Sequence, residues 1–215
     1  MTMRADQPGH EELRRLLSER NQYPERAAQI DERIRAAFER RVAILALDMC
    51  GFSRLSRKHG IIFYLAMIRQ MEDAATPAIL GNGGRVIKQS ADNLYAVFDL
   101  PAQALEAALD VLRAFEAINS VVPDDRDIHG SIGIGFGPTL IIDEADLFGI
   151  EMNLASKLGE DIAGPGEILL TTAAAEALPP GHYRCTPRTG AVGGTEIESA
   201  RFEDVLYPHD QVAQD

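Results

Sequence analysis

The chain of 215 residues is long enough for about one domain with a short extension, and 46% apolar and 25% charged residues are ordinary values for a globular protein. No run approaches the roughly 18 apolar residues of a membrane-spanning helix, and the N-terminus has no apolar segment of a secretory signal. The net charge of −12 disfavours non-specific binding to nucleic acid. Cys50 and Cys185 are too few for a disulfide framework or a structural zinc site. We therefore expect a cytoplasmic protein with no nucleic-acid partner and no membrane span.

Residues 1–40 predict a helical extension. The segment 10–41 is rich in Arg, Glu, Ala and Leu and has no glycine, and Pro24 divides it into predicted helices over 11–20 and 24–40. Ile30, Ile34 and Phe38 recur every four residues and form a narrow apolar stripe. Two interpretations are open. The stripe packs on the chain's own domain, or it dimerises or relays a signal from a regulatory partner.

Residues 41–207 predict one α+β domain, and 208–215 a tail. In chain order we expect a buried strand at 42–47, a helix at 54–80, strands at 85–89 and 94–98, a helix at 101–119, a strand or hairpin at 128–142, a helix at 151–163, a strand at 167–170, a helix at 172–177 and two or three short strands. A hairpin between two helical crossovers predicts a ferredoxin-like sandwich. A doubly wound parallel sheet is the alternative, and the hairpin disfavours it.

The helix at 54–80 has an apolar face. Ile61, Leu65, Ile68 and Met71 recur at helical spacing, so we expect these four side chains to lie on one face of the helix.

Asp48 is the first candidate functional residue. It directly follows the apolar run 42–47, at a strand end, where ligands tend to bind in α/β architectures. The next residues, Cys50, Gly51, Phe52 and Ser53, predict a turn into a helix, whose backbone N–H groups could bind an anion. The alternative is that Asp48 merely caps the next helix.

Asp92 lies at the tip of the predicted hairpin, where Asp is also common for conformational reasons alone. Lys88 precedes it by four residues and shares its face of the strand. A cation on such a half-buried surface needs a carboxylate or a ligand acceptor as its partner.

Glycines alternate with apolar residues over 131–137, which leaves one face of that strand bare. A ligand, a partner chain or a packed helix must approach that face closely. Farther along, Asn153 and Lys157 are four residues apart and share one face of a predicted helix. A solvated amphipathic helix is the alternative interpretation of that pair.

Together these segments resemble the catalytic domain of class III nucleotidyl cyclases, the adenylate and guanylate cyclase family. The resemblance covers about 42–178. It rests on four blocks in order: 47–53 (LDMCGFS), 83–92 (GGRVIKQSAD), the glycine-rich strand 130–137, and 146–157 (DLFGIEMNLASK) closing with 164–171 (GPGEILLT).

The resemblance implies a fold, a cofactor and a set of roles. It implies the ferredoxin-like α+β sandwich and two divalent metal ions, Mg²⁺ or Mn²⁺. Asp48 and Asp92 match the metal-binding carboxylates, and the backbone carbonyl of Met49 matches a further ligand.

The same resemblance implies the substrate and the assembly. Lys88 and Asp146 match the pair that recognises the base, in its adenine-type combination. Asn153 matches the residue that orients the ribose, and Lys157 the residue that stabilises the transition state. Family members work as head-to-tail homodimers, in which one chain supplies the metal carboxylates and the other the remaining groups.

Two positions depart from the family pattern. Lys157 stands where the family usually has Arg, and a lysine lacks the planar fork for two phosphate oxygens. Ala91 stands where the family usually has Gly, and an alanine with positive φ is strained, so the hairpin tip and the metal geometry could differ from the family's.

We therefore expect a cyclase that makes cyclic AMP from ATP for intracellular signalling. The alternatives are a cyclase for GTP or a pyrimidine triphosphate, or a non-catalytic nucleotide-binding or dimerisation module, which Lys157 favours. A cyclic-dinucleotide synthase lacks support, because the chain has no Gly-Gly-Asp/Glu-Glu-Phe turn.

Overall fold

The computed structural model of the chain describes residues 9–51 and 57–206. Its elements follow the predicted order. They are α1 (His10–Gln22), η1 (Pro24–Arg26), α2 (Ala27–Phe38), β1 (Glu39–Met49), α4 (Ile61–Gly81), β2 (Arg85–Ser90), β3 (Asn93–Phe98), α5 (Pro101–Asn119), η2 (Asp124–Arg126), β4 (Gly130–Ile142), β5 (Asp146–Phe148), α6 (Ile150–Lys157), η3 (Leu158–Ile162), β6 (Ile168–Thr171), α7 (Thr172–Glu176), β7 (Tyr183–Val192) and β8 (Thr195–Val205).

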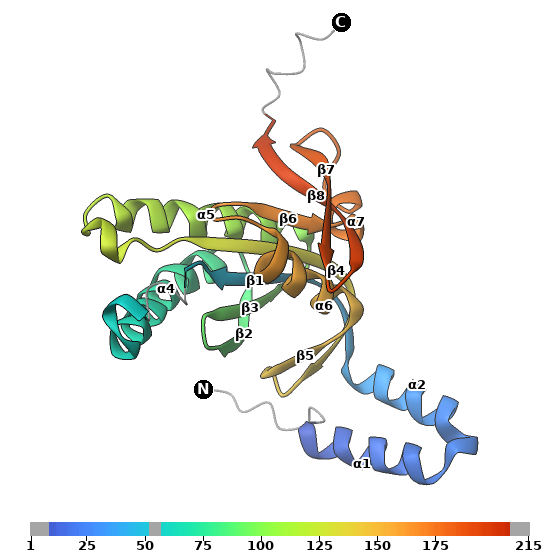
Figure 1. Cartoon of the computed structure of the whole chain (residues 1–215). Coiled ribbons are helices and arrows are strands. Elements are labelled where there is room, and N and C mark those ends of the chain that lie inside the picture. Colours follow the sequence, from blue (N-terminus) through green and yellow to red (C-terminus); the bar gives the residue numbers. More distant parts are fainter. Residues whose placement is uncertain (1–8, 52–56, 207–215) are drawn as a thin grey trace, which may run out of the picture.

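One sheet organises the fold (Figure 1). Its strand order is β2-β3-β1-β4-β6-β8-β7, and β5 pairs with β4. Strands β1 to β4 form antiparallel pairs in the order β2-β3-β1-β4 and are connected through α4 and α5. This is the predicted ferredoxin-like arrangement, a split βαβ unit followed by a second crossover. The predicted fold class is confirmed.

Helices α4 and α5 cover one face of the sheet, where Leu45, Leu47, Ile132 and Ile134 are fully buried. α5 begins at Pro101, where a proline is well tolerated because the N–H that it lacks would have no helical partner.

The buried side of α4 coincides with the predicted apolar face only in part. Ile61 and Leu65 are 56% and 55% exposed, whereas Tyr64 and Met67 are buried together with Ile68 and Met71. The helical period allows either stripe, and the contact with the sheet selects the one that continues through 75 and 79.

Helix α6 covers the opposite face of the sheet and accounts for the alternating glycines of β4. A Cβ atom at Gly133 would lie 2.0 Å from the carbonyl oxygen of Ala155, and one at Gly135 would lie 2.5 Å from that of Glu151. The sequence analysis left a ligand, a partner chain or a packed helix as the group that approaches this glycine face. In the structure it is a packed helix, α6.

The β2–β3 hairpin turns through Ala91 and Asp92, and Ser90 pairs with Asn93. Ala91 has φ +52°, so it accepts the left-handed backbone conformation that glycine adopts at lower cost. The hairpin tip is thus built with positive φ despite the side chain at this position.

Helices α1 and α2 form a hairpin beside the β4–β5 turn (Figure 1). Ile30, Ile34 and Phe38 are buried, as the four-residue stripe predicts, and they pack with Leu16 and with Ile142 of β4. The stripe therefore packs on the chain itself. Whether it also dimerises or relays a signal stays a prediction.

The C-terminal strands are longer than expected. The two or three short strands predicted after α7 are instead one hairpin of two strands, with ten residues in β7 and eleven in β8. The strand predicted at 128–142 is one continuous strand, and Asp146, predicted to lead into a helix, lies in β5. None of the helices in the described part of the chain has the length and apolar character to cross a membrane.

Candidate active site

Asp48 and Asp92 lie together where β1 meets the β2–β3 turn. Asp48 pairs with Asn93 across the sheet, and the backbone N–H of Met49 donates a 3.1 Å hydrogen bond to the carbonyl oxygen of Asp92. Side chains alternate along a strand, so Asp48 points to the face that α6 covers, whereas Leu47 and Met49 point into the α4–α5 core.

The environment of Asp48 is strongly negative. Its carboxyl is half-buried, and burial together with the charges of Asp92, Glu160 and Asp161 raises the pKa of Asp48 to about 7. Like charges this close destabilise the ionised carboxylate, and a bound cation would relieve the repulsion.

The donor set at this position fits a hard divalent cation. Carboxylate and carbonyl oxygens are the ligands that Mg²⁺ and Mn²⁺ prefer. Within residues 9–51 and 57–206, no three His, Cys, Asp or Glu side chains are grouped as a metal cage. In nucleotide enzymes, Mg²⁺ is commonly held by one or two carboxylates together with substrate phosphates and water.

The turn after β1 contains the predicted anion-binding segment. Gly51 has φ +95°, which is the tight turn expected of glycine. The Cys50 N–H already donates to the carbonyl oxygen of His129 at 2.8 Å, and its Sγ lies 3.5 Å from Oγ of Ser131. Burial raises the pKa of the Cys50 thiol, which favours an inert thiol. Phe52 and Ser53 lie outside the described residues.

Lys88 and Asp146, predicted as the base-recognition pair, form an ion pair. Lys88 Nζ lies 2.5 Å from Oδ1 of Asp146, and the two come from β2 and β5, which are 58 residues apart in the chain. The sequence motifs assign this pair through the family resemblance, and the structure shows that the two residues meet without a partner chain.

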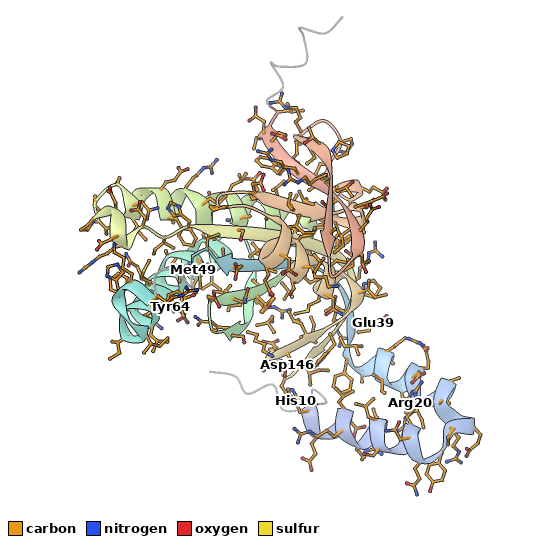
Figure 2. All side chains as sticks on the ribbon, viewed as in Figure 1. His10, Arg20, Glu39, Met49, Tyr64 and Asp146 are labelled. Atoms are coloured by element: carbon orange, nitrogen blue, oxygen red, sulfur yellow. The ribbon has the colours of Figure 1, made fainter. Side chains whose placement is uncertain are left out.

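Asp146 has a second partner that sequence reasoning missed. Nε2 of His10, at the start of α1, lies 3.0 Å from Oδ2 of Asp146, and Figure 2 shows the two residues side by side. The hydrogen bonds from Lys88 first, and then from His10, lower the pKa of Asp146. No local pattern signals this contact, because 136 residues separate the two.

Asn153 and Lys157 lie on α6 and are both exposed. Their spacing of four residues places them on one helix face, as predicted. Two residues that the sequence analysis did not single out, Tyr95 and Ser156, meet beside the same helical segment. Tyr95 on β3 donates a 2.8 Å hydrogen bond to Glu160, and Ser156 lies 3.3 Å from the same hydroxyl. Burial raises the pKa of Tyr95 to about 12, so this hydroxyl stays protonated and remains a donor.

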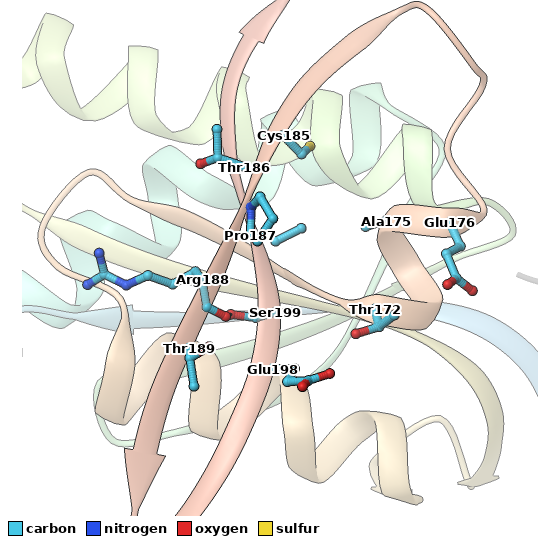
Figure 3. Close-up of a pocket in the computed structure, with 11 residues that line it drawn as sticks. Thr172, Ala175, Glu176, Cys185, Thr186, Pro187, Arg188, Thr189, Glu198 and Ser199 are labelled. Atoms are coloured by element: carbon cyan, nitrogen blue, oxygen red, sulfur yellow. The ribbon is translucent and has the colours of Figure 1, made fainter.

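A separate groove lies between α7 and the β7–β8 hairpin (Figure 3). It has a volume of about 560 Å³, and Cys185, Arg188 and Glu198 are among its lining residues. None of the eleven residues drawn around it belongs to the predicted site.

Comparison with known proteins finds sequence relatives that are named adenylate cyclases. "Putative adenylate cyclase 3" of Rhizobium meliloti is 30% identical over 132 residues, which are 61% of this chain and 22% of that protein. An "Adenylate cyclase" of Streptomyces coelicolor is 31% identical over 140 residues, which are 65% of this chain and 35% of that protein. The chain thus spans about a fifth to a third of the length of these curated relatives. No protein-family model matches the chain.

Among solved structures, the crystal structure of an adenylate/guanylate cyclase/hydrolase from Silicibacter pomeroyi superposes with a TM-score of 0.64 at 27% identity. The match covers 76% of this chain and 96% of that one. Sequence relatives and structural neighbour agree with the motif-based resemblance, which is confirmed. The chain is a homologue of the class III adenylate and guanylate cyclases and has the fold of their catalytic domain.

Proposed function

We propose that the chain is a metal-dependent nucleotidyl cyclase that converts ATP into 3′,5′-cyclic AMP and pyrophosphate for intracellular signalling. The observation that carries the proposal is the half-buried Asp48 beside Asp92, whose excess negative charge suits a cation. The Lys88–Asp146 pair and the exposed face of α6 supply further groups of the kind that bind a nucleotide.

Asp48, Asp92 and the backbone carbonyl of Met49 are the groups that would hold the metal ions. Bound divalent ions activate an attacking hydroxyl and neutralise the charge of the leaving phosphates. The hydrogen bond between the Met49 N–H and the Asp92 carbonyl holds the end of β1 against the β2–β3 turn, so the backbones that carry the two carboxylates lie next to each other.

The base is read by Lys88 and Asp146 in this proposal. An ammonium group can donate only, and a carboxylate can accept only. Adenine presents a ring nitrogen acceptor and an exocyclic amine donor, which match this pair, whereas guanine presents the opposite pattern at those atoms. This complementarity is the reason for preferring ATP.

Asn153 orients the ribose, and Lys157 stabilises the negative charge that develops on the transferring phosphoryl group. Both are exposed on α6, where they are accessible to a nucleotide held by a second copy. We propose a head-to-tail homodimer in which one chain supplies Asp48 and Asp92 and its partner copy supplies the base, ribose and phosphate contacts.

A turnover assay tests the proposal. The purified chain is incubated with ATP, GTP, CTP and UTP separately, with Mg²⁺ or Mn²⁺, and the products are identified by mass spectrometry. We expect cyclic AMP, lost in Asp48→Ala and Asp92→Ala and retained in the control Asp99→Ala, which alters an exposed carboxylate. A different cyclic nucleotide overturns the base assignment and keeps the reaction.

The second candidate is a non-catalytic nucleotide-binding or dimerisation module. Lys157 favours it, because losing one stabilising donor in the transition state can lower the rate on the order of 10²-fold or more. ATP binding without product from any triphosphate would replace the cyclase proposal with this one.

A further inference from the structure

The first turn of α1 is built onto the β4–β5 turn. The backbone N–H of His10 donates a 2.8 Å hydrogen bond to Oδ2 of Asp143, so this carboxylate caps the start of a helix that lies 133 residues away in the chain. A Cβ atom at Gly9 would lie 2.2 Å from Oδ1 of Asp143, so the absence of a side chain at Gly9 permits the contact.

The His10 imidazole bridges two carboxylates. Its Nδ1 lies 2.6 Å from Oδ2 of Asp143, and its Nε2 lies 3.0 Å from Oδ2 of Asp146. Oδ1 of Asp146 accepts from Lys88. Each oxygen of Asp146 therefore has one fixed partner, and each keeps a further lone pair with which to accept a hydrogen bond from a ligand.

Apolar packing holds this arrangement from the other side. Leu16 of α1 is buried against α2 and against Ile142, the last residue of β4. Since Asp146 pairs with Ile142 across the β4–β5 turn, the apolar contact and the polar contact fix the same hairpin.

We propose that His10 is a specificity-determining positioning residue: by bridging Asp143 and Asp146 it orients the Asp146 carboxylate, together with Lys88, to accept the exocyclic amine of adenine. The inference rests on the proposed base recognition. In this inference a residue of the N-terminal extension, His10, contributes to base recognition by Lys88 and Asp146 of the predicted domain.

The bridge requires a protonated imidazole. A neutral imidazole has one donor and one acceptor, so it can donate to only one of the two carboxylates, whereas the imidazolium donates to both. The hydrogen bonds to Asp143 first, and then to Asp146, raise the pKa of His10 above 6.5.

The other charged groups around this contact do not change the sign of the effect. They are Lys88 on β2, the ion pair that joins Arg85 of β2 to Glu144 of the β4–β5 turn, and Glu11 and Glu12 in the first turn of α1. Only His10 among these side chains has an ordinary pKa near neutral pH. The orientation of Asp146 should therefore weaken as the pH rises through the raised pKa of His10.

The test measures binding rather than turnover. The dissociation constants of 2′,3′-dideoxy-ATP and 2′,3′-dideoxy-GTP, which lack the attacking hydroxyl, are determined by calorimetry with Mg²⁺ at pH 6 and pH 8. The full-length chain is compared with His10→Gln, His10→Arg and the control His182→Gln. His182 precedes β7, and its Nδ1 lies 3.1 Å from the carbonyl oxygen of Pro180.

We expect His10→Gln to weaken dideoxy-ATP binding about tenfold at pH 6, the effect of losing one charge-assisted hydrogen bond, and to weaken dideoxy-GTP binding less. The preference of the unsubstituted chain for dideoxy-ATP over dideoxy-GTP should fall as the pH rises through the raised pKa of His10. His10→Arg, which is always charged, should keep it at both pH values. The control should behave as the unsubstituted chain.

An unchanged preference in His10→Gln overturns the inference, and tighter binding overturns it too, because His10 would then obstruct the base. If the unsubstituted chain makes cyclic AMP and the preference is unchanged, the proposed function stands and this inference fails. If it binds neither nucleotide, both fail.

Discussion

The hydroxyl of Tyr64 donates a 2.8 Å hydrogen bond to Oδ2 of Asp92. Tyr64 is 1% exposed and belongs to α4, which packs on the sheet face opposite α6. The contact therefore connects one carboxylate of the proposed metal pair to the main core. A carboxylate held by a buried hydroxyl keeps its orientation when no cation is bound.

Replacing Tyr64 by Phe should weaken metal binding. Asp92 loses a partner that fixes its orientation, and removing such an outer contact typically lowers metal affinity by about 10- to 100-fold. Mn²⁺ affinity can be measured by electron paramagnetic resonance with ATP present. The matched control is Tyr183→Phe, which removes an equal 2.8 Å hydrogen bond to Glu106. Equal Mn²⁺ affinities in the two variants would refute the role of Tyr64.

The raised pKa of Asp48 predicts a stability cost for the metal-free protein at neutral pH. The folded pKa of about 7 exceeds the ordinary value of 3.8, so the folded state binds more protons than the unfolded state between these values. Stability therefore falls as the pH rises through this window. Asp48→Asn should unfold at higher temperature at pH 7.5 in EDTA, by about 2–4 °C for a screened effect on the order of 1 kcal/mol.

The control for that measurement is Asp99→Asn, an exposed carboxylate at the end of β3. Its unfolding temperature should match that of the unsubstituted chain. At pH 4 the advantage of Asp48→Asn should shrink, because Asp48 is then protonated in the folded state. If Asp48→Asn keeps its full gain in unfolding temperature at pH 4, repulsion between Asp48 and the carboxylates around it is not the cause of the gain.

The glycine at 133 should tolerate no side chain. A Cβ atom there would meet the backbone oxygen of Ala155 at 2.0 Å, so Gly133→Ala must push α6 away from the sheet. Overpacking of this kind costs about 1–3 kcal/mol of unfolding free energy, measurable by urea denaturation. Gly81→Ala is the control, because its Cβ would meet nothing within 4 Å. Similar losses in both variants would argue against a tight α6 contact.

Lys157 sets the rate in the proposed reaction. Lys157→Ala should lower kcat with ATP on the order of 10²-fold, since a donor to the developing charge is lost. Lys157→Arg should raise kcat above that of the unsubstituted chain, because the planar guanidinium reaches two phosphate oxygens. Both are measured under saturating ATP. If Lys157→Ala keeps its full kcat, Lys157 has no part in the transition state.

Local sequence patterns predict the structure correctly where the spacing of the apolar residues matches the side that the fold buries. The stripe of Ile30, Ile34 and Phe38 predicts the buried side of α2, and Pro101 marks the start of α5. The alternating glycines of β4 predict a close approach on one face, and the backbone of α6 makes it. In each case the residues that carry the signal lie within a few positions of one another in the chain.

Other features depend on contacts that neighbours in the chain do not encode. The buried stripe of α4 is chosen by the sheet, so Ile61 and Leu65 are exposed although their spacing is helical. The bridge from His10 to Asp146 spans 136 residues. The hydrogen bond from Tyr64 to Asp92 spans 28 residues and joins a helix to a turn. Such pairs become visible only once the sheet order is known.

The junction between α2 and β1 has a mechanical consequence. α2 ends at Phe38 and β1 begins at Glu39, so no loop absorbs movement between them. From that junction β1 runs about 30 Å to Asp48. The same helical hairpin contacts Asp146 through His10. A movement of the N-terminal helices would therefore reach the proposed site at two points. One is Asp48, through β1, and the other is Asp146, through His10.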